Sequence, residues 1–151
     1  MRIALCICPQ WSVQTPSFAI GSLKSHIKNK DVEVEQFDLN IRTSLYTKEK
    51  NIQKFWDWGN DTPWNSEANF KDEILPHFKD LWHEYIDKLA EYDVVAFTTY
   101  ISNIVTTDYI ARYLKQKNPK IQIWYGGPYS WYAESAGLVE NDNYREHVDA
   151  A

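Results

Sequence analysis

Four strand-length segments alternate along the chain with segments of helical periodicity, and this alternation limits the possible folds more than any other feature. Residues 2–8, 94–98 and 121–125 are almost wholly apolar, and residues 32–37 alternate between apolar and polar. Nearly continuous apolar strands are typical of parallel sheets that are buried on both faces. Because helical patterns separate the strands, the sequence predicts an α/β domain with a parallel sheet and helices on both faces.

The segment between the second and third strands, at about residues 43–90, is longer than a simple crossover requires. It carries a helical stripe that we expect to kink or restart at Pro76. The stripe comprises Phe70, Ile74, Phe78, Leu81, Trp82, Tyr85 and Leu89. Trp56, Trp58 and Trp64 precede it among turn residues, and we expect them to form a satellite core rather than a partner surface. The sequence therefore predicts a helical, tryptophan-rich insert.

The end of the chain continues the same rhythm. Trp131, Ser135, Leu138 and Val139 fit a short amphipathic helix, and residues 147–151 resemble the opening of a fifth strand. A domain seldom stops inside an element of its own sheet. The 151 residues are therefore predicted to form one domain of a longer protein.

Bulk composition excludes several functional classes. The net charge of −5 argues against nucleic-acid binding, which requires clustered Lys and Arg. No segment has the roughly 20 apolar residues of a membrane helix, and the start has no secretory signal. Two cysteines make no disulfide framework, so we expect a cytoplasmic protein without membrane or nucleic-acid partners.

The loops that follow the strands hold few titratable residues. They span residues 9–17, 38–42, 99–103 and 126–131, at the edge where parallel α/β sheets bind ligands. Neither GxGxxG nor GxxxxGK[ST] occurs, so the nucleotide-binding motifs are absent. Hydroxyl, glycine and aromatic residues in these loops favour holding a large ligand over acid–base catalysis.

No metal site is predicted from the cysteines and histidines. Cys6 and Cys8 share one face of the first strand and are interpreted as buried small residues. His77 and His83 are six residues apart, which places them on different faces of a helix. His26 and His147 are also predicted to have no special role.

The order of several short motifs resembles the N-terminal cobalamin-binding domain of cobalamin-dependent radical SAM proteins. These motifs are PSFAIGSLKSHIK, then a strand ending in Asp38-Leu39-Asn40, then YDVVAFTTYISN, and finally IQIWYGGPYS followed by HVDAA. The resemblance covers nearly the whole chain outside the insert, so it assigns residues 1–151 to such a domain. It implies a flavodoxin-like (Rossmann-like) sheet that binds cobalamin in an extended, base-off form with its nucleotide tail buried.

The resemblance also implies which residues contact the cofactor. Gly126 and Gly127 would let the tail approach the backbone without a Cβ in the way. Thr98, Thr99 and Ser102 would donate hydrogen bonds to tail oxygens. The corrin would be covered by aromatic side chains, with Ser12 and Pro128 completing the expected contacts. The aromatic residues are Trp11, Tyr100, Tyr129 and Trp131.

The first loop departs from the methionine-synthase-like pattern Asp-x-His-x-x-Gly. It contains no histidine, so it supplies no His ligand to cobalt. The resemblance places S-adenosylmethionine and a 4Fe–4S cluster on a radical SAM domain that would follow, with its CxxxCxxC motif. The present chain would then bind cobalamin without catalysing methyl transfer or related radical chemistry by itself.

Two other functions fit the same pattern. In the first, the domain has lost cofactor binding and its tryptophan-rich insert docks on another domain or protein. In the second, the domain binds a flavin or nucleotide in the same crevice. The cobalamin interpretation predicts that Gly127→Val abolishes tail binding while leaving the fold largely intact.

Overall fold

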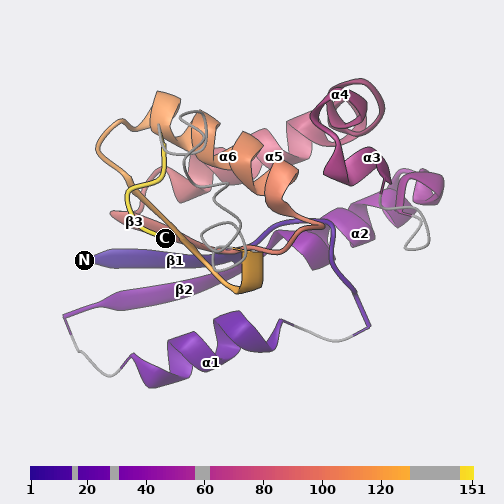
Figure 1. Ribbon diagram of the computed structural model, residues 1–151. Coiled ribbons are helices and arrows are strands. Elements are labelled where there is room, and N and C mark those ends of the chain that lie inside the picture. Colours follow the sequence, from indigo (N-terminus) through magenta and orange to yellow (C-terminus); the bar gives the residue numbers. More distant parts are fainter. Residues whose placement is uncertain (15–16, 28–30, 57–61, 130–146) are drawn as a thin grey trace.

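A four-stranded, all-parallel sheet forms the centre of the domain. In the computed structural model, residues 1–14, 17–27, 31–56, 62–129 and 147–151 are described. The strands are β1 (Arg2–Ile7), β2 (Glu33–Asp38), β3 (Val94–Thr98) and β4 (Gln122–Gly126), in the spatial order β2-β1-β3-β4 (Figure 1). This order is that of flavodoxin-like sheets. Successive strands are first added on one side of β1 and then on the other, so the order of strand addition reverses between β1 and β3. The predicted fold class is therefore confirmed, with β2 and β4 each one residue later than expected.

Helices flank the sheet unequally. Helix α1 (Phe18–His26) lies below the sheet in Figure 1, whereas α5 (Leu75–Leu89) and α6 (Ile104–Lys117) lie above it. Helix α2 (Leu39–Glu49) begins directly after β2. Shorter elements connect α2 to α5: η1 (Gln53–Trp56), α3 (Thr62–Asn65), α4 (Glu67–Asn69) and the π-helical segment η2 (Phe70–Ile74). Among the described residues, α1 alone covers its face of the sheet.

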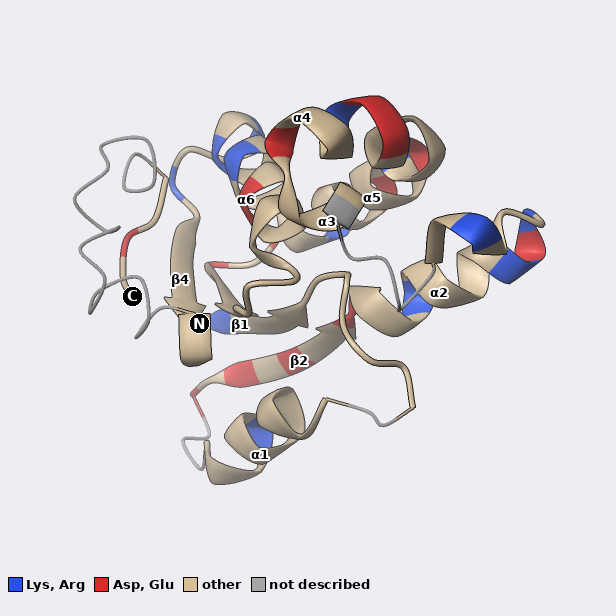
Figure 2. Ribbon diagram, turned by 45° about the vertical axis from the view of Figure 1, so that its right-hand side comes forward, with Lys and Arg blue, Asp and Glu red and all other residues tan. Residues whose placement is uncertain are grey.

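The two faces of the sheet belong to separate hydrophobic clusters because side chains alternate along a strand. Ala4 and Cys6 of β1 join Phe97 and Tyr125 in the large cluster under α5 and α6. Ile3, Leu5 and Ile7 join the small cluster under α1, which contains only one fully buried helix residue, Ile20. Figure 2 shows few charged residues on β1 and β4, as expected of strands that contribute side chains to these clusters.

Both cysteines are buried free thiols, as predicted. Cys6 and Cys8 have no exposed surface. Burial raises the pKa of the Cys6 thiol, and its contact with Cys8 adds to the effect. The raised pKa keeps the Cys6 thiol protonated and unreactive at neutral pH.

The tryptophans of the connecting segment join the main core rather than a satellite cluster. Trp64 is 1% exposed, packs beside Phe78 and Trp82, and donates its Nε1–H to the Phe55 carbonyl at 3.2 Å. Trp56 packs edge-on against Trp64, and Trp58 lies outside the described residues. Pro76 stands in the first turn of α5, where a missing N–H is tolerated, so the helix restarts there as expected.

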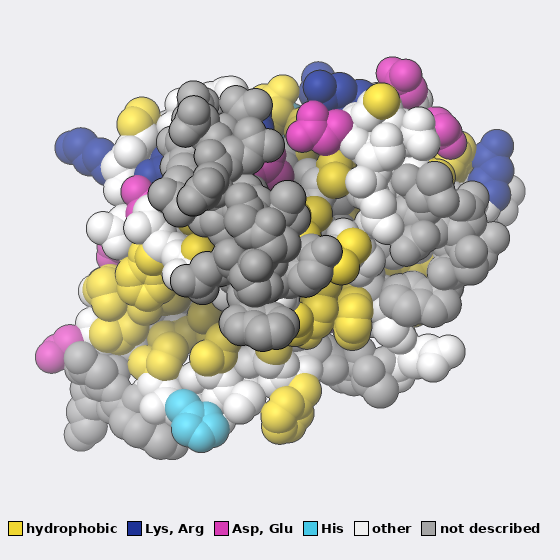
Figure 3. All heavy atoms as spheres, viewed as in Figure 1, with side chains coloured by type: hydrophobic (Ala, Val, Ile, Leu, Met, Phe, Trp, Pro, Cys, Tyr) yellow, Lys and Arg dark blue, Asp and Glu magenta, His cyan; other side chains and the backbone are white. Residues whose placement is uncertain are grey.

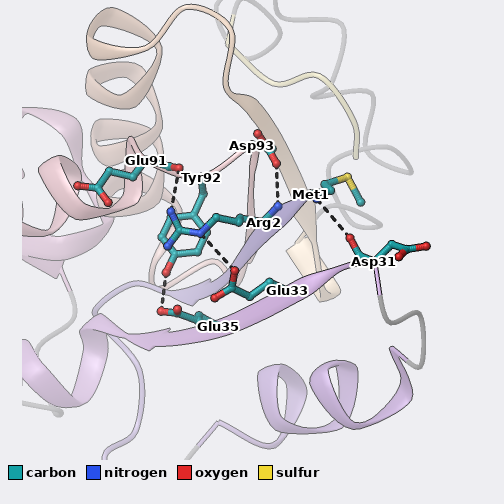
Figure 4. A network of polar contacts seen from close by, with 8 residues as sticks. All are labelled: Met1, Arg2, Asp31, Glu33, Glu35, Glu91, Tyr92 and Asp93. Atoms are coloured by element: carbon teal, nitrogen blue, oxygen red, sulfur yellow. Dashed lines mark hydrogen bonds and ion pairs between the residues drawn. The ribbon is translucent and has the colours of Figure 1, made fainter.

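Arg2 organises the amino-terminal edge of the sheet (Figure 4). Its guanidinium lies 4.4 Å from the centre of the Tyr92 ring, and its backbone N–H donates to Asp93 Oδ2 at 2.7 Å. Tyr92 donates its hydroxyl to Glu35 at 2.5 Å. Burial and this hydrogen bond raise the pKa of Tyr92 to about 12. These contacts join β1, β2 and the turn before β3 near the amino ends of the strands.

The last described segment lies along the outer edge of β4. Asp149 N–H donates to Ile123 O and Tyr125 N–H to Ala150 O, each at 2.8 Å, which forms an isolated parallel bridge. His147 is 5% exposed, and its Nε2 lies 2.6 Å from Asp108 Oδ1. The segment runs parallel to β4, as expected of a fifth strand. The buried contact between His147 and Asp108 was not predicted.

Acid is expected to release this segment from β4. Burial acts to raise the pKa of Asp149, but the hydrogen bonds from Lys115 and from the Ile123 N–H outweigh it, so the pKa is lowered. A lowered pKa means that the stabilisation is complete above the ordinary value near 4 and is lost as pH falls through the folded-state value. Hydrogen-exchange protection of Ile123 and Tyr125 should therefore fall in acid.

Asp149→Asn should give the same loss of protection already at neutral pH, because the amide cannot form the ion pair. The amide of Val95, on the central strand β3, provides the internal control and should not change. If the Ile123 amide of Asp149→Asn were as well protected at neutral pH as that of the wild type, this assignment would be contradicted.

Candidate functional site

A cavity of about 620 Å³ lies between α1 and the sheet. Ile3 and Leu5 of β1, Ala96 of β3 and Trp124 of β4 form its floor, since these side chains alternate toward α1. Phe18, Ile20 and Leu23 are among the α1 residues that form its wall. Figure 3 shows hydrophobic side chains at the surface between α1 and the strands. We call this cavity the α1 groove.

The groove exists because one helix cannot cover four strands. Helix α1 contacts β1 and β2, and no described helix covers β3 and β4 on this face. The carboxyl ends of β3 and β4 form the rim of the groove. The small side chain of Ala96 and the absent side chain of Gly126 leave further space between α1 and this rim. The groove opens at the carboxyl edge of the sheet, where ligands of parallel α/β domains are bound.

The two glycines at this rim serve different purposes. Apart from its chain neighbours, no described residue would bring a heavy atom nearer to a Cβ at Gly126 than Phe97 O at 4.0 Å, so the described residues leave room for a side chain there. Gly127 has φ +102°, and its Cβ would lie 2.8 Å from Thr99 O and 3.1 Å from Thr99 N. Gly127 is therefore required by its own chain, whereas Gly126 leaves space that a ligand can use.

The adjacent residues Thr98 and Thr99 also have different roles. Thr98 points toward α1 and lines the groove. Thr99 is fully buried. Its N–H donates to Gly126 O at 2.6 Å, and its hydroxyl donates to the same oxygen at 2.8 Å. Thr99 also accepts a hydrogen bond from Tyr129 N–H at 3.2 Å. Thr99 thus holds the turn together instead of facing a ligand.

Two buried asparagines position the loops. Asn103 donates Nδ2–H to Cys8 O at 3.3 Å and to Thr98 O at 3.1 Å, and it accepts from Tyr100 N–H at 2.8 Å. Asn40 accepts from Trp11 N–H at 2.8 Å and donates to Ser12 O at 3.3 Å. Asn103 joins the ends of β1 and β3, and Asn40 ties the first loop to α2.

Replacing Asn103 by alanine is expected to lower the free energy of unfolding by about 1–3 kcal/mol, because carbonyls of Cys8 and Thr98 lose a buried donor. Urea denaturation followed by far-ultraviolet circular dichroism measures the loss. Asn118→Ala is the matched control: it removes a half-buried hydrogen bond to Ala90 O and an exposed one from Lys120 N–H, and should cost less. Equal stability of wild type and Asn103→Ala would contradict the bridging role.

The other predicted site residues lie at or behind the rim. Trp11 stacks on Tyr100 with ring centres 4.1 Å apart, and of the two only Tyr100 lines the groove. Ser12 accepts from Gln14 N–H at 3.3 Å. Ser102 has a buried hydroxyl that does not face the groove. The groove therefore brings together five of the ten predicted residues, Thr98, Tyr100, Gly126, Gly127 and Pro128, and not Trp11, Ser12, Thr99, Ser102 or Tyr129. Trp131 lies outside the described residues.

Sequence reasoning missed the apolar floor and the α1 wall. Leu5, Ala96 and Trp124 were interpreted only as strand core, although all three point to the same face by alternation. Comparing that alternation on β1, β3 and β4 with a single covering helix would have indicated surplus apolar surface on the α1 face.

The surroundings of the groove favour binding rather than catalysis. No Asp, Glu, Lys, Arg or His is among its described lining residues, and no cluster suited to a metal ion occurs in the described part of the chain. His77 stacks on Phe55, and His83 pairs with the Tyr109 hydroxyl at 2.9 Å, both away from the groove. Burial raises the pKa of Asp38, whose carboxylate caps α2 by accepting from Ile41 N–H at 2.8 Å.

Comparisons with protein-family models, with curated proteins and with solved structures gave no significant match for this chain. In the described part of the chain, every helix is too short or too polar to cross a bilayer.

Proposed function

We propose that this domain binds a corrinoid cofactor and that the α1 groove receives the cofactor's nucleotide tail. The observation that carries the proposal is the open, uncharged groove beneath Gly126 at the carboxyl edge of the sheet. The order of the short motifs along the chain, by which it resembles cobalamin-binding domains, supports the same ligand class. The groove volume of about 620 Å³ lies within the usual range for small-molecule and cofactor sites.

The uncharged lining favours a corrinoid tail, whose phosphate is a diester with one negative charge, over the more highly charged phosphates of a flavin nucleotide. A flavin mononucleotide or dinucleotide site provides cations or a glycine-rich helix start for its phosphates. Neither lines the groove in the described residues, where the rim offers Thr98, Tyr100 and the backbone at Gly126 and Gly127. A corrinoid also has a broad apolar ring, which the stacked pair Trp11 and Tyr100 would cover at the rim.

The residues present fit a base-off cofactor without a protein histidine from the first loop. That loop contains no histidine, and Trp11 and Ser12 are fixed there by Asn40. When bound, the cobalt would carry a methyl group or assist radical chemistry. Under this proposal the reaction takes place against a radical SAM domain, with its S-adenosylmethionine and 4Fe–4S cluster, and the present chain supplies binding alone.

Incubation with hydroxocobalamin followed by desalting tests the proposal. We expect a stoichiometric coloured complex with the absorption spectrum of the base-off form. Binding of the tail in the groove would remove the lower base from cobalt, and the first loop has no histidine to replace it. Hydroxocobalamin run alone on the same column gives the background. Protein eluting without colour, or colour lost at the rate of the background, would contradict the proposal.

A further inference from the structure

A line of oxidisable side chains crosses the core beneath α5 and α6. The ring centres of Trp56 and Trp64 are 5.5 Å apart, and those of Trp64 and Trp82 are 6.3 Å apart. The ring of Tyr109, on α6, follows at 6.1 Å from Trp82. Trp64 and Trp82 are at most 1% exposed, whereas Trp56 and Tyr109 are half-buried. The line therefore leads from the buried core to partly exposed rings at both ends.

The hydroxyl of Tyr109 lies beside a base. Its oxygen is 2.9 Å from His83 Nε2, and in the tautomer with its proton on Nδ1 the imidazole accepts this hydrogen bond. Burial raises the pKa of Tyr109, and the neighbouring Tyr113 adds to the effect. The phenol is therefore protonated at neutral pH. A protonated phenol gives up an electron readily only when its proton has an acceptor at hand, and His83 supplies that acceptor.

The indole of Trp82 meets a much weaker base. Its Nε1–H donates to Thr43 Oγ1 at 3.0 Å in a buried position. A hydroxyl group does not take the proton of an oxidised indole, so Trp82 that loses an electron keeps its proton and carries a positive charge. This radical cation is a strong oxidant next to a phenol that can release both an electron and a proton.

We propose that these rings form an electron-transfer relay that carries an oxidising equivalent out of the core to Tyr109. A one-electron oxidant, such as a carbonate or organic radical, removes an electron from an indole of the line. One electron then passes from Tyr109 to oxidised Trp82, and the Tyr109 hydroxyl proton moves to His83 Nε2. Trp82 is restored, Tyr109 becomes a neutral radical and His83 becomes an imidazolium. A small one-electron reductant, ascorbate or a thiolate, returns the electron, and His83 returns the proton.

A second cavity gives such a reductant access to Tyr109. It has a volume of about 300 Å³, is lined by Tyr109 and Tyr113, and carries both acidic and basic residues at its rim, among them Lys71. The cavity adjoins α6, on the face of the sheet opposite α1 (Figure 1). The relay therefore does not depend on the ligand of the α1 groove.

Flash oxidation followed by transient absorption tests the relay. Ruthenium(III) tris-bipyridine, generated by light with a cobalt(III) ammine as electron acceptor, serves as the oxidant. In the wild type, decay of the tryptophanyl radical should match the rise of a tyrosyl radical, and both should slow in heavy water because a proton moves with the electron. Tyr109→Phe and His83→Phe should lose the matched rise. Tyr46→Phe is the control, since Tyr46 packs against Phe78 in the same core, and it should behave like the wild type.

Mass spectrometry provides a readout that a packing role would not move. After exposure to carbonate radicals with ascorbate present, Tyr109→Phe should accumulate more oxidised Trp64 and Trp82 than the wild type or Tyr46→Phe. Tyr109→Phe removes a single oxygen atom, so the test stands if His83→Phe fails to fold, and circular dichroism checks each variant. Absence of transfer in the wild type, a matched rise that persists in Tyr109→Phe, or equal tryptophan oxidation in Tyr109→Phe and wild type would overturn the inference.

Discussion

Replacing Gly127 by valine is expected to destabilise the domain by at least about 3 kcal/mol, with or without ligand. A non-glycine residue in such a backbone conformation costs on the order of 1–3 kcal/mol, and here φ is +102°. The new Cβ would also lie 2.8 Å from Thr99 O and 3.4 Å from Thr98 Cγ2, so the turn after β4 or the backbone after β3 must move. A loss of this size is a large fraction of the roughly 5–15 kcal/mol by which domains are stable.

Urea denaturation of Gly127→Val beside wild type measures this effect. Gly21→Ala is the matched control, because its Cβ would meet only Gln36 Nε2 at 3.8 Å within helix α1. That control should gain about 0.5–1 kcal/mol from helix propensity. The sequence alone suggested that Gly127→Val would spare the fold, and this expectation is wrong because the glycine accommodates the chain's own Thr99 backbone. Wild-type stability of Gly127→Val would contradict the present account.

The second large effect is expected at Gly126. Gly126→Leu places a side chain into the α1 groove, where no described residue other than its chain neighbours has a heavy atom closer to the new Cβ than 4.0 Å. The hydrogen bonds from Thr99 to Gly126 use only the backbone oxygen and are retained. We expect the stability to change by less than about 1 kcal/mol, as is usual for a substitution without a clash, while cobalamin affinity falls at least about a hundredfold, or about 2.7 kcal/mol.

A spectrophotometric cobalamin titration of Gly126→Leu, wild type and Gly21→Ala measures the change in affinity. Gly21→Ala should bind like wild type, because position 21 does not line the groove. Undiminished cobalamin binding by folded Gly126→Leu would show that the ligand does not use the α1 groove. The two glycine variants together separate a structural loss at Gly127 from a ligand-specific loss at Gly126.

The strands were predictable because burial leaves a local signature. Residues 94–98 were predicted to form a strand, and β3 has the same bounds, since VVAFT is apolar throughout and is packed from both sides. The end of α6 before Pro119 was also predictable from the restriction that proline places on its predecessor. Cys6 and Cys8 were assigned correctly as buried thiols on the same basis.

The site was only half predictable because it depends on distant segments. Thr98 and Thr99 are adjacent and chemically identical, yet Thr98 lines the groove, whereas Thr99 is fully buried and donates its hydroxyl to Gly126 O. The bridging role of Asn103 depends on where β1 ends, far away in sequence, so its local sequence gives no indication of it. The open groove itself arises from how much of the sheet α1 covers, a property of packing that no single motif encodes.

Nuclear magnetic resonance of the ¹⁵N-labelled protein during cobalamin titration tests the central claim most directly. The account predicts saturable shifts of the Trp124 indole and of the Leu5, Ala96 and Gly126 amides, all of which belong to residues that line the groove. The amides of Arg2 and Asp93, at the opposite edge, should remain unchanged. Unchanged groove resonances at saturating cobalamin, or shifts confined to the opposite edge, would contradict it.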